Sequence, residues 1–587
     1  MRRLSARSLL TAALSLLLCA GAPARAQYVG DFALLDHTGK FHQLSYYGDE
    51  EAVVLAVHRA GLDATERSLA QFRALRERYA DQPVRFFMIN AMPAEDRVAV
   101  DAAVRRQGLD VPVLLDTAQL VAQRLDLRHV GEVMVLDPER QRLTYRSTLA
   151  SGQAQGLIAA IDARLAGAPA PDEVPAAPTP ASVAAADRVT YPVRDALSRE
   201  PVSYSRDIVP ILENNCVACH TEGGIAPWAM TSHRMVQGFG PMIKEVVTTR
   251  RMPPGQIDQH QSKPIRDVAG LSPLEQQQLI HWIDAGAPID GSEDPLTAVR
   301  PAPSKFTMGE PDLVYRIPAQ EIPATGVLDY RYVPLKLNLE QDVWVRAMEF
   351  VPGDRQVLHH VIAYLQSPAD RSREGRRDTV ARGESVGGFA PGRVGEDFGP
   401  EGGRLLQKGA NLLLQMHYTT SGKPSVDETE IGIYLHDAPP KYVMKEVVAA
   451  QRRFMVPPHA KEHQLQGEQL IERDAYLHAM MPHMHYRGKY MNYTAVYPDG
   501  TSERLLSVPR YDFNWQFNYE LEEPVFLPAG TRLIASGAMD NSARNRGNPD
   551  PSRPVHFGLQ TQHEMFFGFT TLRYVDVVPQ VASVGEE

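Results

Sequence analysis

The placement of cysteine constrains this chain more than any other feature of its sequence. The 587 residues contain three cysteines, Cys19, Cys216 and Cys219. Cys19 lies in an N-terminal apolar leader, so one pair remains, and only two residues separate its members. Such a pair can act only locally. The long region after residue 219 must therefore fold without disulfide bonds, by packing and hydrogen bonding alone.

Residues 1–26 have the composition of a secretory signal peptide. Arginines precede an apolar stretch over residues 9–20, and Ala24-Arg25-Ala26 forms a small-residue cleavage site. An uncleaved membrane anchor is the alternative, because the two kinds of segment share a basic flank and an apolar stretch. No later apolar run approaches roughly 20 residues, so we expect no membrane span in the mature chain. The sequence predicts an exported, periplasmic protein, and its formal net charge of −10 argues against a nucleic-acid partner.

Cys216-Val217-Ala218-Cys219-His220 is a C-x-x-C-H motif. Two thioether bonds from Cys216 and Cys219 can fix a porphyrin while His220 supplies the proximal iron ligand. A zinc or redox pair is the alternative, but zinc would need further cysteines or histidines at ligand spacing. The motif, together with the export signal, predicts a covalently attached haem c.

Residues 203–296 carry this motif and have a helical pattern. Ser272 and Glu275 match a capping box, and Gly286 matches a helix stop. The segment resembles a small class I cytochrome c over about 85 residues, which implies an all-α domain. Met252, in a proline-rich loop, is the preferred sixth haem ligand because a thioether suits electron transfer. Five other side chains compete with it: Met230, Met235, Met242, His233 and His260.

Residues 27–166 alternate between strand-like and helix-like patterns. Apolar runs of strand length at 52–57 and 84–90 flank a segment with apolar residues at helical spacing. These apolar residues are Leu69, Phe72, Leu75 and Tyr79. Further strands are expected at 111–115 and 133–136. The alternation of strand, helix and strand predicts an α/β domain.

Residues 32–40 resemble the opening hairpin of the peroxiredoxin family, whose thioredoxin-like fold we expect over about 130 residues. In that family a reactive cysteine follows the first buried strand, but residues 59–65 of this chain contain none. Because the thiolate is the nucleophile, thiol peroxidase and disulfide-exchange chemistry are excluded. We expect a docking or scaffolding role for this domain. A Pro- and Ala-rich, semi-rigid linker over 167–202 would tether it to the rest of the chain.

From residue 305 onward the pattern changes to short alternating strands between proline and glycine turns. Residues 342–348 and 492–496 are two such strands, and Pro498-Asp499-Gly500 follows the second. About 280 residues of this pattern predict an all-β structure with two sandwich modules.

Two of these strands carry histidines suited to a metal. His359 and His360 are adjacent, and neighbouring side chains on a strand point to opposite faces. Both can therefore bind one metal only near a bulge or a strand end, which argues against a core role. His417 lies in the later strand 414–418 as a single inward histidine. Taken alone, each of these two clusters is also compatible with an ordinary structural role.

His483 and His485 form a third cluster, in which both imidazoles share one face of a strand. Met565 follows about 80 residues later, and alone it would be taken for a core methionine. Imidazoles suit copper, and a thioether favours the softer Cu(I) state. His478 and His563 lie near these motifs and are interpreted as supporting or surface histidines.

The order of these clusters is HH, then Q-x-H-Y, then H-x-H, then E-M. This order resembles the copper type II, ascorbate-dependent monooxygenases, which include peptidylglycine α-hydroxylating monooxygenase and dopamine β-monooxygenase. The resemblance covers residues 305–580 and implies tandem jelly-roll modules of about eight or nine strands, at 305–440 and 441–580, with one copper each. It implies that the electron-transfer copper is held by His359, His360 and His417. It implies that the catalytic copper, which binds oxygen, is held by His483, His485 and Met565.

The implied reaction hydroxylates an activated C–H bond with O2 and two electrons. An external reductant, either ascorbate-like or an exported electron-donor protein, would supply the electrons. In peptidylglycine hydroxylation an Arg, an Asn and a Tyr assist binding of the substrate carboxylate, but Met481, Phe567 and Phe569 stand at those positions here. An unpaired carboxylate there would cost on the order of several kcal/mol. We therefore expect a small-molecule or apolar-faced substrate, aromatic or other, and not a glycine-extended peptide.

The domain order predicts a self-contained redox enzyme, in which the haem accepts electrons and passes them to the His359, His360 and His417 copper. The alternative is a non-catalytic copper and haem electron-transfer protein, in keeping with a first domain that has lost its thiols. In a third interpretation the copper unit uses ascorbate and the haem senses redox state. The presence of all six copper ligands favours the enzyme.

Overall fold

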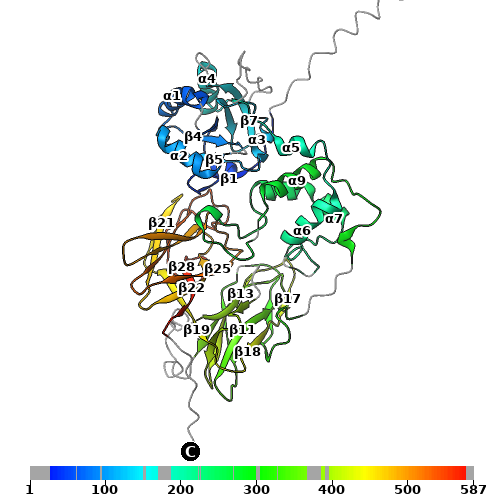
Figure 1. Cartoon of the computed structure of the whole chain (residues 1–587), viewed down its shortest axis with the longest axis vertical. Coiled ribbons are helices and arrows are strands. Elements are labelled where there is room, and N and C mark those ends of the chain that lie inside the picture. Colours follow the sequence, from blue (N-terminus) through cyan, green and yellow to red (C-terminus); the bar gives the residue numbers. More distant parts are fainter. Residues whose placement is uncertain are drawn as a thin grey trace, which may run out of the picture. The chain divides into compact units, whose positions relative to one another are not determined.

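The computed structural model describes residues 27–60, 63–92, 95–149, 154–168, 187–222, 224, 226–268, 270–298, 305–326, 328–366, 385–390 and 395–576. The expected signal peptide and residues 169–186 of the expected linker lie outside these ranges. The chain divides into two compact units. The first contains Met1–Glu200 and Glu245–Arg250, and the second contains Pro201–Lys244 and Arg251–Glu587. Figure 1 labels several elements of each unit.

The first unit contains a five-stranded mixed sheet in the order β5-β4-β3-β6-β7. Its strands β3, β4 and β5 are parallel, whereas β6 and β7 are antiparallel additions. The strands of this unit are β1 (Ala33–Leu35), β2 (Phe41–Gln43), β3 (Ala52–His58), β4 (Val84–Asn90), β5 (Val113–Leu115), β6 (Glu132–Asp137) and β7 (Arg142–Thr148). The helices are η1 (Leu44–Tyr47), α1 (Asp63–Arg78), α2 (Arg97–Gln107), α3 (Leu120–Arg124), α4 (Ala154–Leu165) and α5 (Pro192–Leu197).

Strand β3 is buried on both faces, which explains why its sequence is a continuous apolar run and not an alternating one. Alternate β3 side chains enter two different cores, Val53 and Leu55 marking one and Val54 the other. The four residues at helical spacing, Leu69, Phe72, Leu75 and Tyr79, all join the second of these cores. The predicted thioredoxin-like α/β domain is present, with β5 starting two residues later than the strand expected at 111–115.

Residues 187–200 also pack into this unit, although the sequence pattern assigned them to the linker 167–202. Val189 and Tyr191 are buried in the core that contains Val53. The Tyr191 hydroxyl donates to the carbonyl of Leu127 at 2.6 Å, so a polar group within this core is satisfied. These residues are therefore part of the domain and not of a free tether.

The second unit begins with short helices. They are η3 (Tyr204–Ile208), α6 (Val209–Asn215), α7 (His233–Gly238), α8 (Gly240–Thr248), η4 (Gln259–Gln261), α9 (Pro273–Asp284) and η5 (Pro295–Thr297). The part of α8 from Glu245 onward is counted with the first unit. Helix α9 starts as predicted, because the Ser272 hydroxyl accepts the Glu275 N–H while the Glu275 side chain accepts the Ser272 N–H. Beyond its end, Gly286 adopts a φ of +89°, the left-handed conformation that glycine permits.

A first β-module follows, defined as strands β8 to β18. They are β8 (Leu313–Arg316), β9 (Gln320–Ile322), β10 (Arg331–Lys336), β11 (Val343–Val351), β12 (Leu358–Gln366), β13 (Ser385–Phe389), β14 (Gly395–Asp397), β15 (Gly402–Leu406), β16 (Asn411–Tyr418), β17 (Ser425–Asp427) and β18 (Glu430–Leu435). One sheet has the order β10-β16-β12-β13, and β15-β11-β18-β8 belong to another. Leu335 and Leu414 of the first sheet share a core with Phe350 and Ile431 of the second, as in a sandwich.

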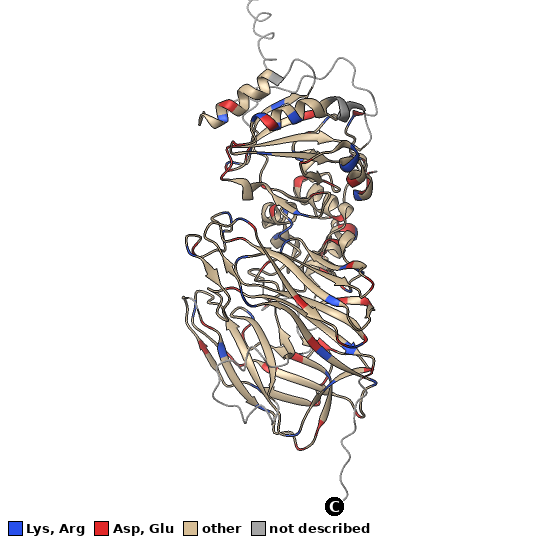
Figure 2. Cartoon of the chain, turned by 90° about the vertical axis from the view of Figure 1, so that its left-hand side faces the viewer, with Lys and Arg blue, Asp and Glu red and all other residues tan. Residues whose placement is uncertain are grey.

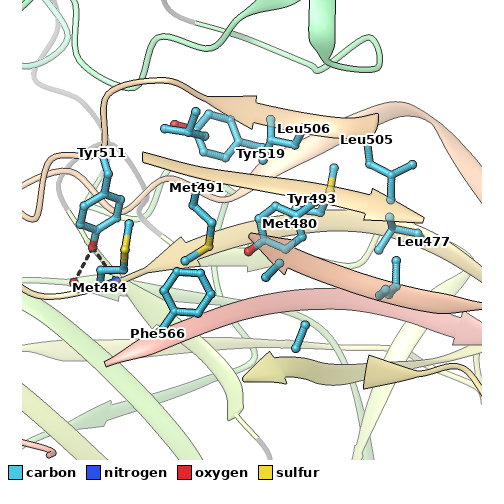
Figure 3. Close-up of a cluster of buried hydrophobic side chains, with 14 of the residues drawn as sticks. Leu477, Met480, Met484, Met491, Tyr493, Leu505, Leu506, Tyr511, Tyr519 and Phe566 are labelled. Carbon is cyan, nitrogen blue, oxygen red and sulfur yellow. Dashed lines mark hydrogen bonds between the residues drawn. The ribbon is translucent and has the colours of Figure 1, made fainter. Parts of the chain in front are cut away.

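The second β-module is defined as strands β19 to β28. They are β19 (Tyr442–Gln451), β20 (Met455–Val456), β21 (His463–Leu470), β22 (Ala475–His483), β23 (Gly488–Val496), β24 (Ser502–Val508), β25 (Tyr519–Leu527), β26 (Arg532–Met539), β27 (Val555–His556) and β28 (Phe566–Tyr574). Its core includes Leu477 and Met480 of β22, Tyr493 of β23 and Phe566 (Figure 3). The all-β region predicted from residue 305 is therefore present, while the specific jelly-roll topology stays a prediction.

Acidic and basic residues are interspersed along the chain in each unit (Figure 2). Among the described residues, no helix has the length and the apolar composition that crossing a membrane would require.

Candidate metal centres

His359, His360 and His417 come together where strands β12 and β16 pair. Leu358 lies opposite Tyr418 and His360 lies opposite His417, so His359 is an extra residue in the ladder, a β-bulge. This is the irregularity that the adjacent histidines require, because it lets both side chains turn to one side. One ring nitrogen from each of the three histidines lies within 4.8 Å of the others.

The three histidines have the geometry and protonation of metal ligands. The Nδ1 atoms of His359 and His360 are 3.0 Å apart, close to the spacing of two nitrogens that each bind one metal at about 2 Å. The Nδ1 atom of His417 is buried without a hydrogen-bond partner, although buried polar atoms are normally paired. Burial, aided by the neighbouring imidazoles, lowers the pKa of His417 to about 3. A neutral imidazole with a free lone pair is the form that binds a metal.

His483 and His485 form a second group at the end of β22. The Nδ1 atom of His483 is 2.7 Å from the Oε1 atom of Gln516, and that of His485 is 3.2 Å from the carbonyl oxygen of His563. Since each acceptor oxygen requires a proton on Nδ1, the Nε2 atom of each ring keeps its lone pair. The Nε2 atom of His485 is buried without a partner. A hydrogen bond from the ring nitrogen that does not bind the metal is typical of metal-ligating histidines.

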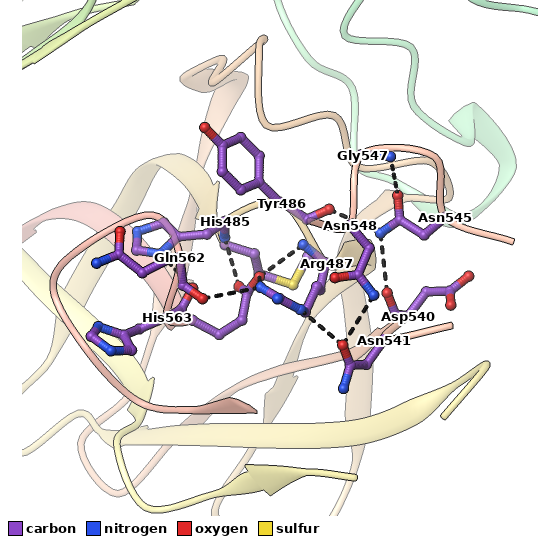
Figure 4. A network of polar contacts seen from close by, with 12 residues as sticks. His485, Tyr486, Arg487, Asp540, Asn541, Asn545, Gly547, Asn548, Gln562 and His563 are labelled. Carbon is purple, nitrogen blue, oxygen red and sulfur yellow. Dashed lines mark hydrogen bonds and ion pairs between the residues drawn. The ribbon is translucent and has the colours of Figure 1, made fainter. Parts of the chain in front are cut away.

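A buried ion pair fixes the backbone around His485 (Figure 4). The Glu564 carboxylate accepts the backbone N–H groups of His485 at 2.9 Å and Arg487 at 2.8 Å. The Arg487 guanidinium lies 3.5 Å from the same carboxylate and donates to Asn541 at 3.0 Å. Burial raises the pKa of Glu564 to about 7, against the opposing effect of Arg487. Sequence reasoning missed this pair, although two charged residues close in sequence to the histidines of these motifs were a usable signal.

Met565 lies directly before β28, and alternation along that strand places it on the same face as Phe567 and Phe569. Cross-strand pairing sets His483 opposite Phe567 and Met481 opposite Phe569. These side chains form one apolar cluster with parts of β19, and the Phe569 ring is 6.0 Å from the His483 ring. Met481, Phe567 and Phe569 are therefore gathered beside the second histidine group.

The two histidine groups lie next to each other. The rings of His360 and His483 are 6.3 Å apart. Tyr330 contacts both groups, since its ring lies 4.8 Å from His417 and 6.2 Å from His485. His563 is exposed and supports His485 through its carbonyl, as interpreted from the sequence.

The C-x-x-C-H motif forms the turn that follows α6. Cys216 and Cys219 are half-buried free thiols, and burial raises the pKa of each. The Nδ1 atom of His220 donates to the carbonyl of Trp228 at 3.0 Å, which leaves Nε2 free to bind a metal. The residues present therefore fit a haem attached through both sulfurs and ligated by His220.

The structure narrows the choice of a sixth haem ligand. His233 is half-buried, donates from its Nε2 atom to the carbonyl of Ala287 at 2.8 Å, and packs its ring against Trp282, so a structural role accounts for it. The side chains of Met235 and Met242 are 38% and 47% exposed, and His260 is exposed. The remaining candidates are Met252, which is half-buried in the loop after α8, and Met230, which is buried. Met230 also donates its backbone N–H to the carbonyl of His220 at 2.8 Å.

In the first unit, a polar network occupies the place where the peroxiredoxin resemblance puts a reactive cysteine. Glu95 accepts the backbone N–H of Ala60 at 2.9 Å and the Arg59 Nε–H at 3.1 Å. Asn90, at the end of β4, donates to the same carboxylate at 2.6 Å. This network links residues just after β3 to β4 and has no thiol chemistry.

Comparisons with known proteins agree with the fold of this first unit. Residues 26–152 match the model of the AhpC/TSA family. A hypothetical protein from Sinorhizobium meliloti 1021 is 27% identical, with a TM-score of 0.23 over 26% of this chain and 91% of that one. Peroxidoxin BcpB from Mycobacterium tuberculosis is 20% identical, with a TM-score of 0.22 over 25% of this chain and 98% of that one. No curated protein sequence matches. The AhpC/TSA match over residues 26–152 agrees with the thioredoxin-like α/β sheet of the first unit.

Proposed function

We propose that this protein is an exported copper-dependent monooxygenase that receives electrons through a covalently attached haem c. One observation carries the proposal. Five buried histidines from both β-modules converge, and the ring nitrogens that would bind a metal are free of other partners in at least two of them, His417 and His485. Leaving such atoms unpaired costs free energy, so their retention is best explained by a bound metal.

His359, His360 and His417 would hold one copper, and His483, His485 and Met565 would hold the other. Copper bound there would supply one-electron redox chemistry and the activation of O2. The protein's own part is positioning. Gln516 and the His563 carbonyl fix the ring orientation and the protonated nitrogen of His483 and His485. The thioether of Met565 is a weak, soft ligand, which leaves the second site open enough for chemistry.

The apolar cluster beside His483 supports a substrate with an apolar face. Met481, Phe567 and Phe569 would exclude water and would contact a hydrocarbon or aromatic group through dispersion and burial. A carboxylate placed against them would lose its hydration without a paired cation among these three side chains. Glycine-extended peptides are therefore poor substrates in this proposal.

The test is copper loading followed by measured O2 uptake. We expect close to two copper ions per haem-bearing chain, and O2 uptake that increases with small apolar substrates once the haem is reduced. His417→Ala should lose about one copper, whereas His463→Ala, which changes a half-buried β21 histidine outside the cluster, should lose none.

Two results would count against the proposal in different ways. A wild-type protein that binds no copper would rule out both metal sites. A protein that binds two coppers and exchanges electrons with its haem, but consumes no O2 with any substrate, would instead be the electron-transfer protein that the sequence left as an alternative. Met565→Ala should abolish O2 uptake while the haem remains reducible.

A further inference from the structure

One loop of the second β-module touches both histidine groups. We call residues 509–518, between β24 and β25, the bridging loop. The Phe513 ring stacks on His359 at 5.0 Å and lies 5.8 Å from His485. The loop therefore reaches the first group across the module boundary and the second group within its own module.

Gln516 of the bridging loop lies between the two groups and is 4% exposed. Its Oε1 atom is 2.7 Å from Nδ1 of His483, and its Nε2 atom is 3.4 Å from Nδ1 of His360. The amide nitrogen also donates to the carbonyl of Phe513 at 3.3 Å, which holds the amide in this orientation. A buried amide oxygen can only accept, so Gln516 requires His483 to be protonated on Nδ1 and free on Nε2.

The same loop forms hydrogen bonds to the backbone of Met484, the residue between the two histidines of the H-x-H motif. The Tyr511 hydroxyl donates to the carbonyl of Met484 at 2.6 Å and accepts its N–H at 3.0 Å (Figure 3). The backbone N–H and the backbone carbonyl of the buried Met484 are thereby both satisfied by one side chain. The position of the bridging loop consequently fixes the position of the second histidine group.

Residues 255–258, which follow Met252 and which we call the clamp, pack against this loop and the strands on either side of it. Gly255 has a φ of +77°, and a Cβ atom built on it would lie 2.5 Å from the Phe517 ring. Tyr519, the first residue of β25, donates its hydroxyl to the carbonyl of Gly255 at 3.1 Å. Ile257 enters the core of the second β-module, and the Asp258 N–H donates to Ser507 of β24 at 2.9 Å. The clamp therefore holds the bridging loop at both of its ends.

From these contacts we propose that Gln516 is the positioning residue of the second metal site, where it fixes His483, and that Gly255 sets its place through the bridging loop. The inference rests on the proposed function, because it assigns Gln516 to the second site proposed there. It makes the haem-bearing segment a structural support for copper binding, since Gly255 lies three residues after the candidate haem ligand Met252. Outer partners of metal-bound histidines typically contribute about 10- to 100-fold in metal affinity.

Variants at Gln516 test the first part. Gln516→Leu keeps the size of the side chain and removes its hydrogen bonds, so the affinity of the second site for copper should fall about 10- to 100-fold. The electron paramagnetic resonance spectrum of the Cu(II)-loaded protein should change as well. Gln516→Glu keeps an acceptor oxygen for His483 and should restore most of the affinity. Unchanged copper affinity and spectrum in Gln516→Leu would overturn the assignment while leaving the proposed function standing.

Glycine variants test the second part in the full haem-bearing chain. Gly255→Ala introduces a Cβ against Phe517 and should change the Cu(II) spectrum although residue 255 is no ligand. Gly286→Ala is the matched control, because Gly286 has a similarly positive φ of +89° but no atom within 4 Å of the added Cβ. Combining Gly255→Ala with Phe517→Ala should restore the wild-type spectrum by removing the clash. If Gly255→Ala and Gly286→Ala give the same copper spectrum, the clamp is not coupled to the metal sites.

Discussion

At the scale of single residues, the Glu564–Arg487 pair fixes the backbone beside the proposed second metal site. Both side chains are almost fully buried, at 0% and 3% exposure. Removing one partner of such a pair typically costs about 3–5 kcal/mol, because the other charge is left uncompensated. We expect Glu564→Ala to lower the free energy of unfolding by this amount and to weaken copper binding through the released His485 backbone. Denaturant unfolding of the copper-free protein and a copper titration measure the two effects.

A surface pair provides the control for that experiment. Glu468 lies 3.4 Å from Arg532, and both side chains are at least 40% exposed. Exposed pairs contribute only about 0–1 kcal/mol, so Glu468→Ala should change neither stability nor copper affinity appreciably. Equal losses in both variants would show that burial of the Glu564 pair has no special role.

The buried Asp116 carboxyl in the first unit makes the stability of this unit depend on pH. Burial raises the pKa of its carboxyl to about 6, although backbone N–H groups at the start of α3, including that of Ala122 at 2.7 Å, oppose the shift. The folded domain therefore holds this proton more tightly than the unfolded chain, in which the pKa of the carboxyl is 3.8. The contribution of the protonated Asp116 carboxyl to the free energy of unfolding is complete at low pH. It is lost as the pH rises from about 4 to about 6. Asp116→Asn should flatten this part of a plot of unfolding temperature against pH, and parallel plots would contradict the assignment.

At the scale of elements, local patterns predicted what depends on local causes. The apolar run of β3, the spacing in α1 and the capping box of α9 each reflect a period or a cap within one segment. The need for a bulge at His359 and His360 also follows from strand geometry alone. Gln516 could not be found in this way, because it lies in a loop without periodicity and approaches a histidine 156 residues away. Only the pairing of the strands brings it between the two sites.

The bulge in β12 leads to a prediction of its own. Leu358 and His360 pair with the adjacent residues Tyr418 and His417, so His359 is a true insertion into the ladder. Deleting His359 should therefore give a regular antiparallel pair with Leu358 still in the core and His360 still on the opposite face. We expect the deletion to remain folded by circular dichroism and to lose the first copper, and we expect the same loss from His359→Ala. An unfolded deletion variant would show that the bulge is needed for the fold itself.

At the scale of the whole molecule, the boundary of the first domain is a consequence of tertiary packing that composition conceals. Residues 187–200 share a Pro- and Ala-containing linker pattern with what precedes them, yet Val189 and Tyr191 are 8% and 6% exposed. The Tyr191 hydroxyl lies within hydrogen-bond distance of two backbone carbonyls, those of Leu127 and Ala122. It thereby fixes residues 187–200, which we call the strap, to the domain. Sequence patterning could not reveal this, because two apolar residues are too few to define a period.

The strap predicts where the first domain can be separated from the rest of the chain. A fragment of residues 27–200 should fold cooperatively, whereas a fragment of residues 27–168 should be less stable. The shorter fragment exposes the surface that two large side chains cover, each worth about 1.5–3 kcal/mol when fully buried, and loses the Tyr191 hydrogen bonds. Urea unfolding followed by circular dichroism measures the difference, which we expect to be at least about 3 kcal/mol. Tyr191→Ala in the longer fragment should lose part of it, while Arg199→Ala, an exposed change in the same segment, should lose none. Equal stability of the two fragments would mean that residues 187–200 only rest on the domain, and that 166 is its true boundary.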